Sequence, residues 1–300
     1  MLNFRQLSIF VAVAELGSFT KAAKHLFMTQ PAISWQIKSL ETELGLTLLE
    51  RGDRNVSLTE AGKLFYTEAK RLNNLYERLM ADIEEYKGLG KGNLKMGAST
   101  IPGEYLLPNY IGRFKQLYPE VNISLSIGDT RRIVEKLLMD SIQLGIIGAK
   151  LEETKLDFFP FKEDHLILIA APDHPWGKKD AIGLTDLFPA SYVLREEGSG
   201  TRMVIEQELA KQDFSLNDFD VVMELGSTRA VITAVAAGLG VSWVSHWAVQ
   251  EALSLGTVRQ VKVEGLEMKR TIYLAIRRNR TLSPLAKAFA DYLLQGNSKE

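Results

Sequence analysis

The chain has 300 residues, a formal net charge of −1 and no cysteine. Hydrophobic residues make up 46% and charged residues 24% of it, a globular balance that excludes a disordered or collagen-like chain. Without cysteine there is no disulfide, no thiolate nucleophile and no cysteine-ligated metal, and with balanced charge any binding of nucleic acid must rest on particular residues.

The first part of the chain has the pattern of short helices separated by tight turns. Apolar residues recur every three or four positions, and Gly17 and Gly45 suit the left-handed conformation that ends helices. Thr29 is a favourable N-cap, with Pro31 in the first turn after it. The expected helices cover 2–15, 20–26 and 29–45. The last two form a helix-turn-helix, and the polar turn within 48–58 is typical of a β-wing.

A long helix without proline is predicted over 59–86. Phe65, Leu72, Leu79 and Tyr86 recur along it every seven residues. At 1.5 Å per residue it would be roughly 40 Å long. Such a helix needs a partner along its apolar seam, either a second copy of the chain or the chain's own second domain. We favour the second copy because the seam is narrow and the other faces are charged.

From Leu94 onward, predicted strands and helices alternate, which is typical of an α/β fold with mostly parallel sheets. Two such series predict two lobes with a cleft between them, joined by crossing segments near 161–165 and 266–270. Four strand-to-helix turns are rich in glycine, serine and threonine, at 98–100, 128–130, 198–202 and 226–229. Free N–H groups and positive helix ends converge at such turns and favour an anion. Simple helix capping is the alternative role of these hydroxyls.

Motifs along the whole chain resemble one family. The runs Gly17-Ser18-Phe19-Thr20-Lys21-Ala22-Ala23, Thr29-Gln30-Pro31-Ala32-Ile33-Ser34 and Leu58-Thr59-Glu60-Ala61-Gly62 are similar to the DNA-binding head of LysR-type transcriptional regulators. Two positions depart from the family pattern: Trp35 replaces a residue that is usually basic, and Leu49 replaces an aromatic one. The resemblance implies a winged helix-turn-helix, a long dimerisation helix and a two-lobed effector domain with the fold of type II periplasmic binding proteins.

On this basis the chain is expected to divide into four parts. These are a DNA-binding domain at 1–58, a linker and dimerisation helix at 59–87, a hinge at 88–93 and an effector-binding domain at 94–300. Within the last, lobe I covers about 94–162 and 268–300, and lobe II about 163–267.

The third helix is expected to read double-stranded DNA in the major groove through its N-terminal residues. Gln30 suits a bidentate contact with adenine, and Pro31 or Ala32 a contact with a thymine methyl. The alternative is an ordinary polar helix face, with Trp35 covering an apolar patch. The expected DNA-binding residues, including cations that would hold phosphates, are Thr29, Gln30, Pro31, Ala32, Ser34, Trp35, Lys38, Arg51 and Arg54.

Charge predicts that one head alone binds DNA weakly. Residues 1–66 contain seven basic and six acidic side chains, and non-specific affinity grows with the number of phosphates neutralised. Two linked heads on palindromic half-sites overcome this weakness. We therefore expect a homodimer or homotetramer, and RNA polymerase is left open as a further partner.

The loop Glu196-Glu197-Gly198-Ser199-Gly200-Thr201-Arg202 resembles the inter-lobe loop of family members that sense small anions in sulfur assimilation or carbon fixation. Arg202 would clamp a carboxylate, sulfate or phosphate. Asp129 would repel an anion unless it faces solvent or pairs with a nearby arginine. The expected effector-binding residues are Ser99, Thr100, Gly128, Asp129, Thr130, Gly148, Ser199, Gly200, Thr201, Arg202, Ser227 and Thr228. No cofactor is expected besides this effector, a small anion of unknown identity.

Catalytic motifs are missing from the sequence, and we expect no enzyme activity, catalytic residue or metal. The four histidines are scattered without metal-ligand spacing, and Gly198-Ser199-Gly200 lacks the glycine spacing of a nucleophile elbow. No apolar run of about 18 residues would span a bilayer, so we expect a cytoplasmic protein without a membrane partner. The alternative function is a cytosolic solute-binding protein without a DNA role.

Overall fold

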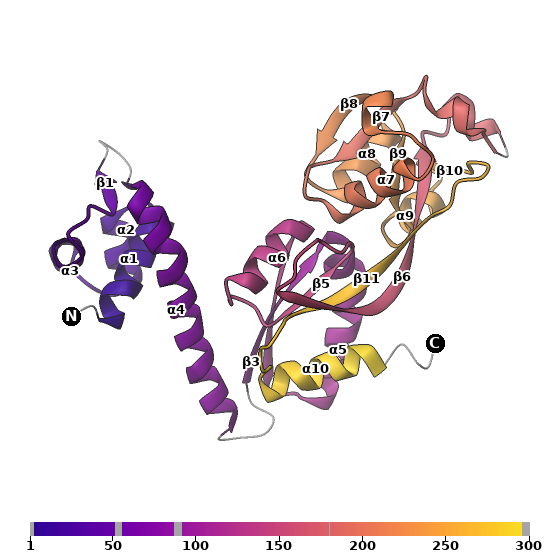
Figure 1. The fold of residues 1–300 in the computed structure, drawn as a ribbon. Helices are drawn as coiled ribbons and strands as arrows, with labels where there is room; N and C mark the ends of the chain where they lie inside the picture. Colours follow the sequence, from indigo (N-terminus) through magenta and orange to yellow (C-terminus); the bar gives the residue numbers. More distant parts are fainter. Residues whose placement is uncertain (1–2, 52–55, 87–91, 180, 296–300) are drawn as a thin grey trace. The chain divides into compact units, whose positions relative to one another are not determined.

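A computed structural model describes residues 3–51, 56–86, 92–179 and 181–295. The chain divides into two compact units, one of Met1–Tyr86 with Met139–Ser141 and one of Lys87–Leu138 with Ile142–Glu300 (Figure 1). Within these ranges, none of the helices combines the length and apolarity that a membrane crossing requires.

The first unit has the predicted helix-turn-helix and wing. Its elements are α1 (Phe4–Leu16), α2 (Phe19–His25), α3 (Gln30–Leu44), β1 (Leu49–Arg51), β2 (Val56–Leu58) and α4 (Glu60–Tyr86). Gly17 and Gly45 end α1 and α3 in the left-handed conformation, as predicted, with φ of 59° and 67°. Thr29 occupies the N-cap position of α3, although its side chain makes no capping hydrogen bond.

The wing is fixed to α3 and α4 by backbone contacts. The backbone N–H groups of Leu48 and Leu49 donate to Oε1 of Glu41 on α3, at 2.8 and 3.1 Å. A Cβ at Gly62 would lie 2.0 Å from the Leu48 carbonyl oxygen, so only glycine lets α4 approach the chain here. These contacts set where the long helix leaves the head.

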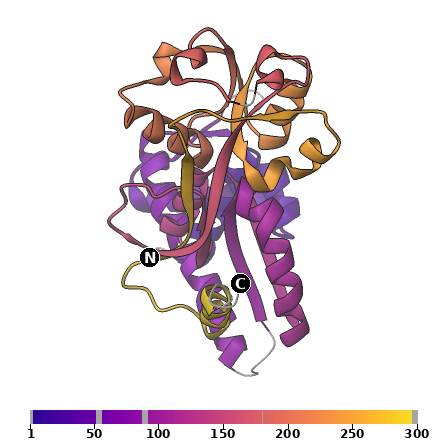
Figure 2. The same ribbon diagram turned by 90° about the vertical axis from the view of Figure 1, so that its right-hand side faces the viewer.

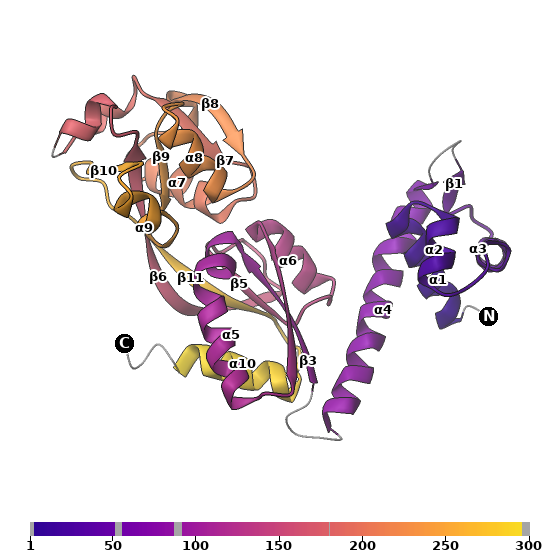
Figure 3. The ribbon, with the colours of Figure 1, turned by 180° about the vertical axis from the view of Figure 1, so that it is seen from behind.

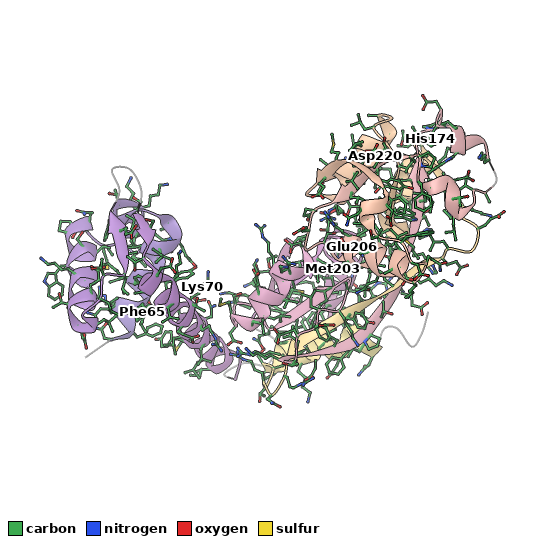
Figure 4. The ribbon with its side chains drawn as sticks, turned by 45° about the horizontal axis from the view of Figure 1, so that its top comes forward. Phe65, Lys70, His174, Met203, Glu206 and Asp220 are labelled. Carbon is green, nitrogen blue, oxygen red and sulfur yellow. The ribbon has the colours of Figure 1, made fainter. Side chains whose placement is uncertain are left out.

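The first turns of α4 pack on α1 rather than facing outward. Phe65 meets Phe10 edge to face with ring centroids 5.1 Å apart, and Lys70 pairs with Glu15 of α1 (Figure 4). Phe65 therefore belongs to the head's core rather than to the predicted seam. Farther along α4, apolar side chains stay 41–53% exposed, namely Leu72, Leu75, Tyr76, Leu79, Met80 and Ile83. We call these six residues the α4 stripe.

Phe27, in the turn between α2 and α3, combines backbone strain with full exposure. Its φ is 53°, and its side chain is 98% exposed. The left-handed conformation costs a non-glycine residue about 1–2 kcal/mol, and asparagine tolerates it better than phenylalanine.

We therefore expect Phe27→Asn to stabilise the head by about 0.5–1 kcal/mol, since it relieves strain without losing buried area. Urea unfolding followed by amide exchange in α1–α3 would measure this. Leu46→Asn is the control, because Leu46 is also exposed, at 53%, and has no positive φ. An equal gain in both variants would contradict the strain argument.

Lobe I of the second unit is a three-layered α/β lobe. It contains β3 (Gly92–Ser99), β4 (Val121–Gly128), β5 (Leu144–Ile147), a π-helical turn (Pro102–Leu106), α5 (Leu107–Leu117), α6 (Thr130–Leu138) and α10 (Pro284–Gln295). Strand β3 pairs in parallel with β4 and β5. Helices α5 and α10 pack together through Phe114 and Phe289, whose ring centroids are 4.9 Å apart (Figure 3).

The hinge predicted at 88–93 includes two residues, Gly92 and Asn93, that belong to a strand. Gly92 and Asn93 begin β3, because they pair in parallel with Val121 and Asn122 of β4. The predicted hinge positions 88–91 lie outside the described residues.

Lobe II is built around a second set of strands and helices. It contains β7 (Ser191–Arg195), α7 (Gly200–Ala210), β8 (Asp220–Leu225), α8 (Thr228–Ala236), β9 (Ser242–Ser245), α9 (His246–Ser254) and β10 (Arg259–Val261). Strands β7 and β8 are parallel.

Two long strands, β6 (Leu156–Ala170) and β11 (Met268–Arg277), run from one lobe to the other (Figure 2). They pair with each other and belong to a seven-stranded sheet ordered β10-β6-β11-β5-β3-β4, with β9 also on β6. The expectation of mostly parallel sheets is wrong for this sheet. The chain leaves lobe I through β6 and returns through β11, so these two neighbours must be antiparallel.

Candidate functional site

The exposed face of α3 carries the expected DNA-reading residues. Ile33, Ile37 and Leu40 are fully buried in the head's core, and the opposite face is open to solvent. Thr29, Gln30, Pro31, Trp35 and Lys38 are exposed, and Ala32 and Ser34 are half-buried. The Gln30 amide donates to Oγ of Ser34 at 3.1 Å, which orients it along the helix.

Trp35 remains 67% exposed, so it does not serve as a cover for an apolar patch of the head. Arg54 and the side chain of Arg51 lie outside the described residues. The phosphate contacts expected of these two arginines therefore remain predictions.

In the second unit, turns from both lobes close around one small cavity. The inter-lobe cavity is lined by Ser99, Thr100, Ile101, Asp129, Thr130, Arg195, Ser199, Gly200, Thr201 and Arg270. Three of the four predicted strand-to-helix turns meet here, following β3, β4 and β7. Its volume of about 10 Å³ is room for about one water molecule. A metabolite therefore needs the lobes or the loops to move apart.

Arg195, at the end of β7, is the first of two buried guanidinium groups at the cavity. Its Nη1 donates to Oγ1 of Thr228 at 2.7 Å, and its Nη2 lies 3.4 Å from Oγ1 of Thr100 in lobe I. Its Nε and Nη2 also donate to the two carboxylate oxygens of Glu196, at 2.7 and 2.8 Å. Although burial opposes it, this pairing holds the pKa of the Glu196 carboxyl below its usual value.

Arg270, on β11, carries the second buried guanidinium group at the cavity. Its Nε and Nη2 donate to Oδ2 of Asp164 on β6, at 2.8 and 2.6 Å, and its Nη1 donates to Oγ1 of Thr201 at 3.1 Å. Ser245 donates to the other oxygen of Asp164 at 2.9 Å. Burial lowers the pKa of Arg270, and the Asp164 carboxylate opposes that effect. A Cβ at Gly148 would lie 3.0 Å from Nη1, so glycine leaves room for the guanidinium.

Thr130 presents the one buried side-chain polar atom without a hydrogen-bond partner in the described part of the chain. The residue is fully buried at the start of α6, and it lines the cavity. Buried hydroxyls are normally paired with protein or with water, so the Thr130 hydroxyl is available to a molecule in the cavity.

Asp129 does not meet the cavity as a free charge. Its Oδ1 accepts from the backbone N–H of Arg132 at 2.8 Å, and its Oδ2 lies 3.7 Å from Nε of Arg132. Of the two arrangements expected from the sequence, solvent exposure or pairing with a nearby arginine, Asp129 shows the second.

Five predicted effector residues do not line the cavity. Two of them adjoin its arginines: Thr228 accepts a hydrogen bond from Arg195, and Gly148 lies beside the guanidinium of Arg270. Ser227 caps α8 by accepting from the backbone N–H of Ala230 at 3.1 Å. Gly128 ends β4, outside the lining. Arg202 also lies outside it and donates to Glu206 on α7 (Figure 4) at 3.0 Å and to Glu224 at 2.6 Å.

The two cavity arginines were missed by sequence reasoning. Arg195 closes the apolar run of β7 directly before the glycine-rich loop, and that position at a strand's carboxyl end was an available signal. Arg270 gave no such signal, because its segment reads only as charged residues entering an apolar strand.

Gly200 allows the two lobes to close on each other. A Cβ there would lie 2.6 Å from Oγ1 of Thr130 and 3.3 Å from the backbone carbon of Gly148. We therefore expect Gly200→Ala to destabilise the second unit by about 1–3 kcal/mol, measured by urea unfolding.

Gly226→Ala is the matched control, because Gly226 occupies the corresponding turn before α8 and a Cβ there would meet nothing within 4 Å. Adding Thr130→Ala to Gly200→Ala should recover part of the loss. Equal stability of the two alanine variants would show that the lobes do not meet at Gly200.

Two family models match the chain. The one described as "Bacterial regulatory helix-turn-helix protein, lysR family" covers residues 4–63, and "LysR substrate binding domain" covers residues 87–298. The chain is 37% identical over 292 residues to a probable RuBisCO transcriptional regulator of Nostoc sp., covering 96% of this chain and 87% of the relative. It is 35% identical to the HTH-type transcriptional activator CmpR of Synechocystis sp., covering 97% and 94%.

Solved structures show the same folds. The regulatory domain of Synechocystis CcmR in complex with 2-PG aligns with a TM-score of 0.64 and 28% identity, covering 69% of this chain and 98% of that one. Full-length CbnR complexed with its target DNA aligns with a TM-score of 0.74, covering 98% and 99%, and at 24% identity it bears on the fold alone.

Proposed function

Because the chain belongs to the LysR family of transcriptional regulators, we propose that it binds operator DNA as a homo-oligomer and responds to a small oxyanion in the inter-lobe cavity. The regulatory helix-turn-helix at 4–63 overturns the alternative of a solute-binding protein without a DNA role. The relatives are regulators rather than enzymes. We place the protein in the cytoplasm because its target is DNA.

The observation that carries the effector proposal is the pair of buried guanidinium groups beside the unpaired Thr130 hydroxyl. Arg195 and Arg270 reach the same small cavity from different strands. Guanidinium groups bind carboxylate, sulfate and phosphate through parallel hydrogen bonds, and the starts of α6 and α7 add partial positive charge. The 2-PG in the CcmR regulatory domain and the relatives' names favour an effector from carbon fixation.

The α4 stripe and the charge of the head support an oligomer. Six apolar side chains exposed along one helix match the seam of a helix pair, with a second copy as the simplest partner. A head with nearly balanced charge gains affinity when two are linked on palindromic half-sites.

Gln30 tests the reading of DNA. We expect Gln30→Ala to weaken binding to the operator by about tenfold or more, since a bidentate contact with a base contributes roughly 1–3 kcal/mol, and to leave non-specific binding unchanged. Gel shifts with operator and random duplexes would measure both. Gln36→Ala is the control, six residues farther along α3 and on another face. Equal losses on both duplexes would contradict a base-reading role.

Thermal unfolding of the full chain tests the effector. The panel contains sulfate, thiosulfate, phosphate, 2-PG, O-acetylserine and dicarboxylates. An oxyanion at 100 times its dissociation constant should stabilise the protein by about 2.7 kcal/mol, a shift of a few degrees. Thr100→Val and Thr201→Val should reduce that shift, because each removes a hydroxyl at an arginine. The absence of any shift across the panel would contradict the proposed anion site.

A further inference from the structure

Arg195, which lines the cavity, is already paired with the carboxylate of the next residue, Glu196, which lies outside the lining. Its Nε and Nη2 hold the two oxygens of Glu196 in a bidentate arrangement at 2.7 and 2.8 Å. These are the two parallel N–H groups that a ligand's carboxylate, phosphate or sulfate would use. The other contacts of the guanidinium go to Thr228 and Thr100, so Glu196 occupies the edge best suited to an oxyanion.

The pair at Arg270 shows by contrast that Glu196 is placed to leave. The Asp164 side chain is 0% exposed and is held by Ser245 as well as by Arg270. The Glu196 side chain is 31% exposed, and no side chain other than Arg195 is hydrogen-bonded to it in the described part of the structure. Water can therefore replace Arg195 as the partner of the Glu196 carboxylate, whereas the enclosed Asp164 carboxylate has no access to water.

Only the side chain of Glu196 needs to move. Its backbone is held in place, with the N–H donating to the Leu225 carbonyl at 3.3 Å and the carbonyl accepting from the Ser199 N–H at 3.2 Å. The cavity has room for about one water molecule, so an entering oxyanion must displace some group from Arg195. Glu196 is the group that is both charged and partly exposed.

We propose that Glu196 is an internal counter-ion: it occupies the oxyanion position on Arg195 until the ligand's oxyanion displaces it into solvent. This inference rests on the proposed effector site. Glu196 then selects for ligands that carry a carboxylate, phosphate or sulfate group, because a neutral polar ligand gains too little from Arg195 to replace a carboxylate. It also raises the ligand concentration at which the regulator responds.

The test compares Glu196→Gln with Glu197→Gln in the full chain. Glu197 is the matched control because it is the adjacent carboxylate on the same loop, is exposed, and its substitution removes the same charge without breaking the Arg195 pair. Sulfate, phosphate and 2-PG serve as probes. Affinity is measured by calorimetry and by the thermal shift of each variant relative to its own ligand-free midpoint.

We expect Glu196→Gln to tighten binding of the probes by roughly three- to tenfold, the range for a partly exposed charge-assisted pair, and Glu197→Gln to change it by less than about twofold. If both variants bind the probes more tightly to the same extent, the effect comes from the loss of one negative charge on the loop, and the counter-ion proposal is overturned. If the wild-type protein binds a probe and the Glu196→Gln variant binds it equally well or more weakly, the counter-ion proposal is overturned and the proposed effector site stands. Binding of no probe by either protein would overturn both.

Discussion

The second unit depends on one buried ion pair, Arg270 with Asp164. The two residues are direct partners in the antiparallel register of β11 and β6, the strands that join the lobes. Their side chains are 3% and 0% exposed. Removing either partner would leave an uncompensated buried charge, which costs more than the intact pair contributes. A slip of one residue would separate the two side chains, so the pair favours the observed register and holds Arg270 at the cavity.

The same pair connects the cavity to several elements. Ser245 at the end of β9 donates to Asp164, and Thr201 at the start of α7 accepts from Arg270. An anion bound at Arg270 would act on groups that already hold the crossing strands and lobe II together. A ligand shifts the equilibrium between open and closed lobes only as far as its affinities for the two states differ. The close approach of Gly200 to Thr130 belongs to the closed state and would be lost if the lobes opened.

The two cavity arginines have different charge environments, and this difference gives the site its chemistry. Arg270 has a permanent buried partner, so its contribution to a ligand is the remaining N–H edge beside Thr201. Arg195 has a partner that solvent reaches, so its whole bidentate edge becomes available when Glu196 leaves. One arginine thus holds the fold, and the other is free to exchange one carboxylate for another.

The helix-turn-helix, the wing, the long helix and the glycine- and hydroxyl-rich turns could be predicted from local patterns, because periodicity, caps and turn residues are local properties. Which arginine faces the cavity depends instead on residues that folding brings together from distant parts of the chain. Arg202 lies in the predicted loop, but Glu206 one turn later and Glu224 on β8 draw it away. Arg195 and Arg270 took its place because strand pairing turns their side chains inward. The antiparallel course of β6 and β11 was likewise decided there: Pro160 and the charged residues at 162–164 interrupt the apolar pattern of β6, and its direction follows from the return of the chain through β11.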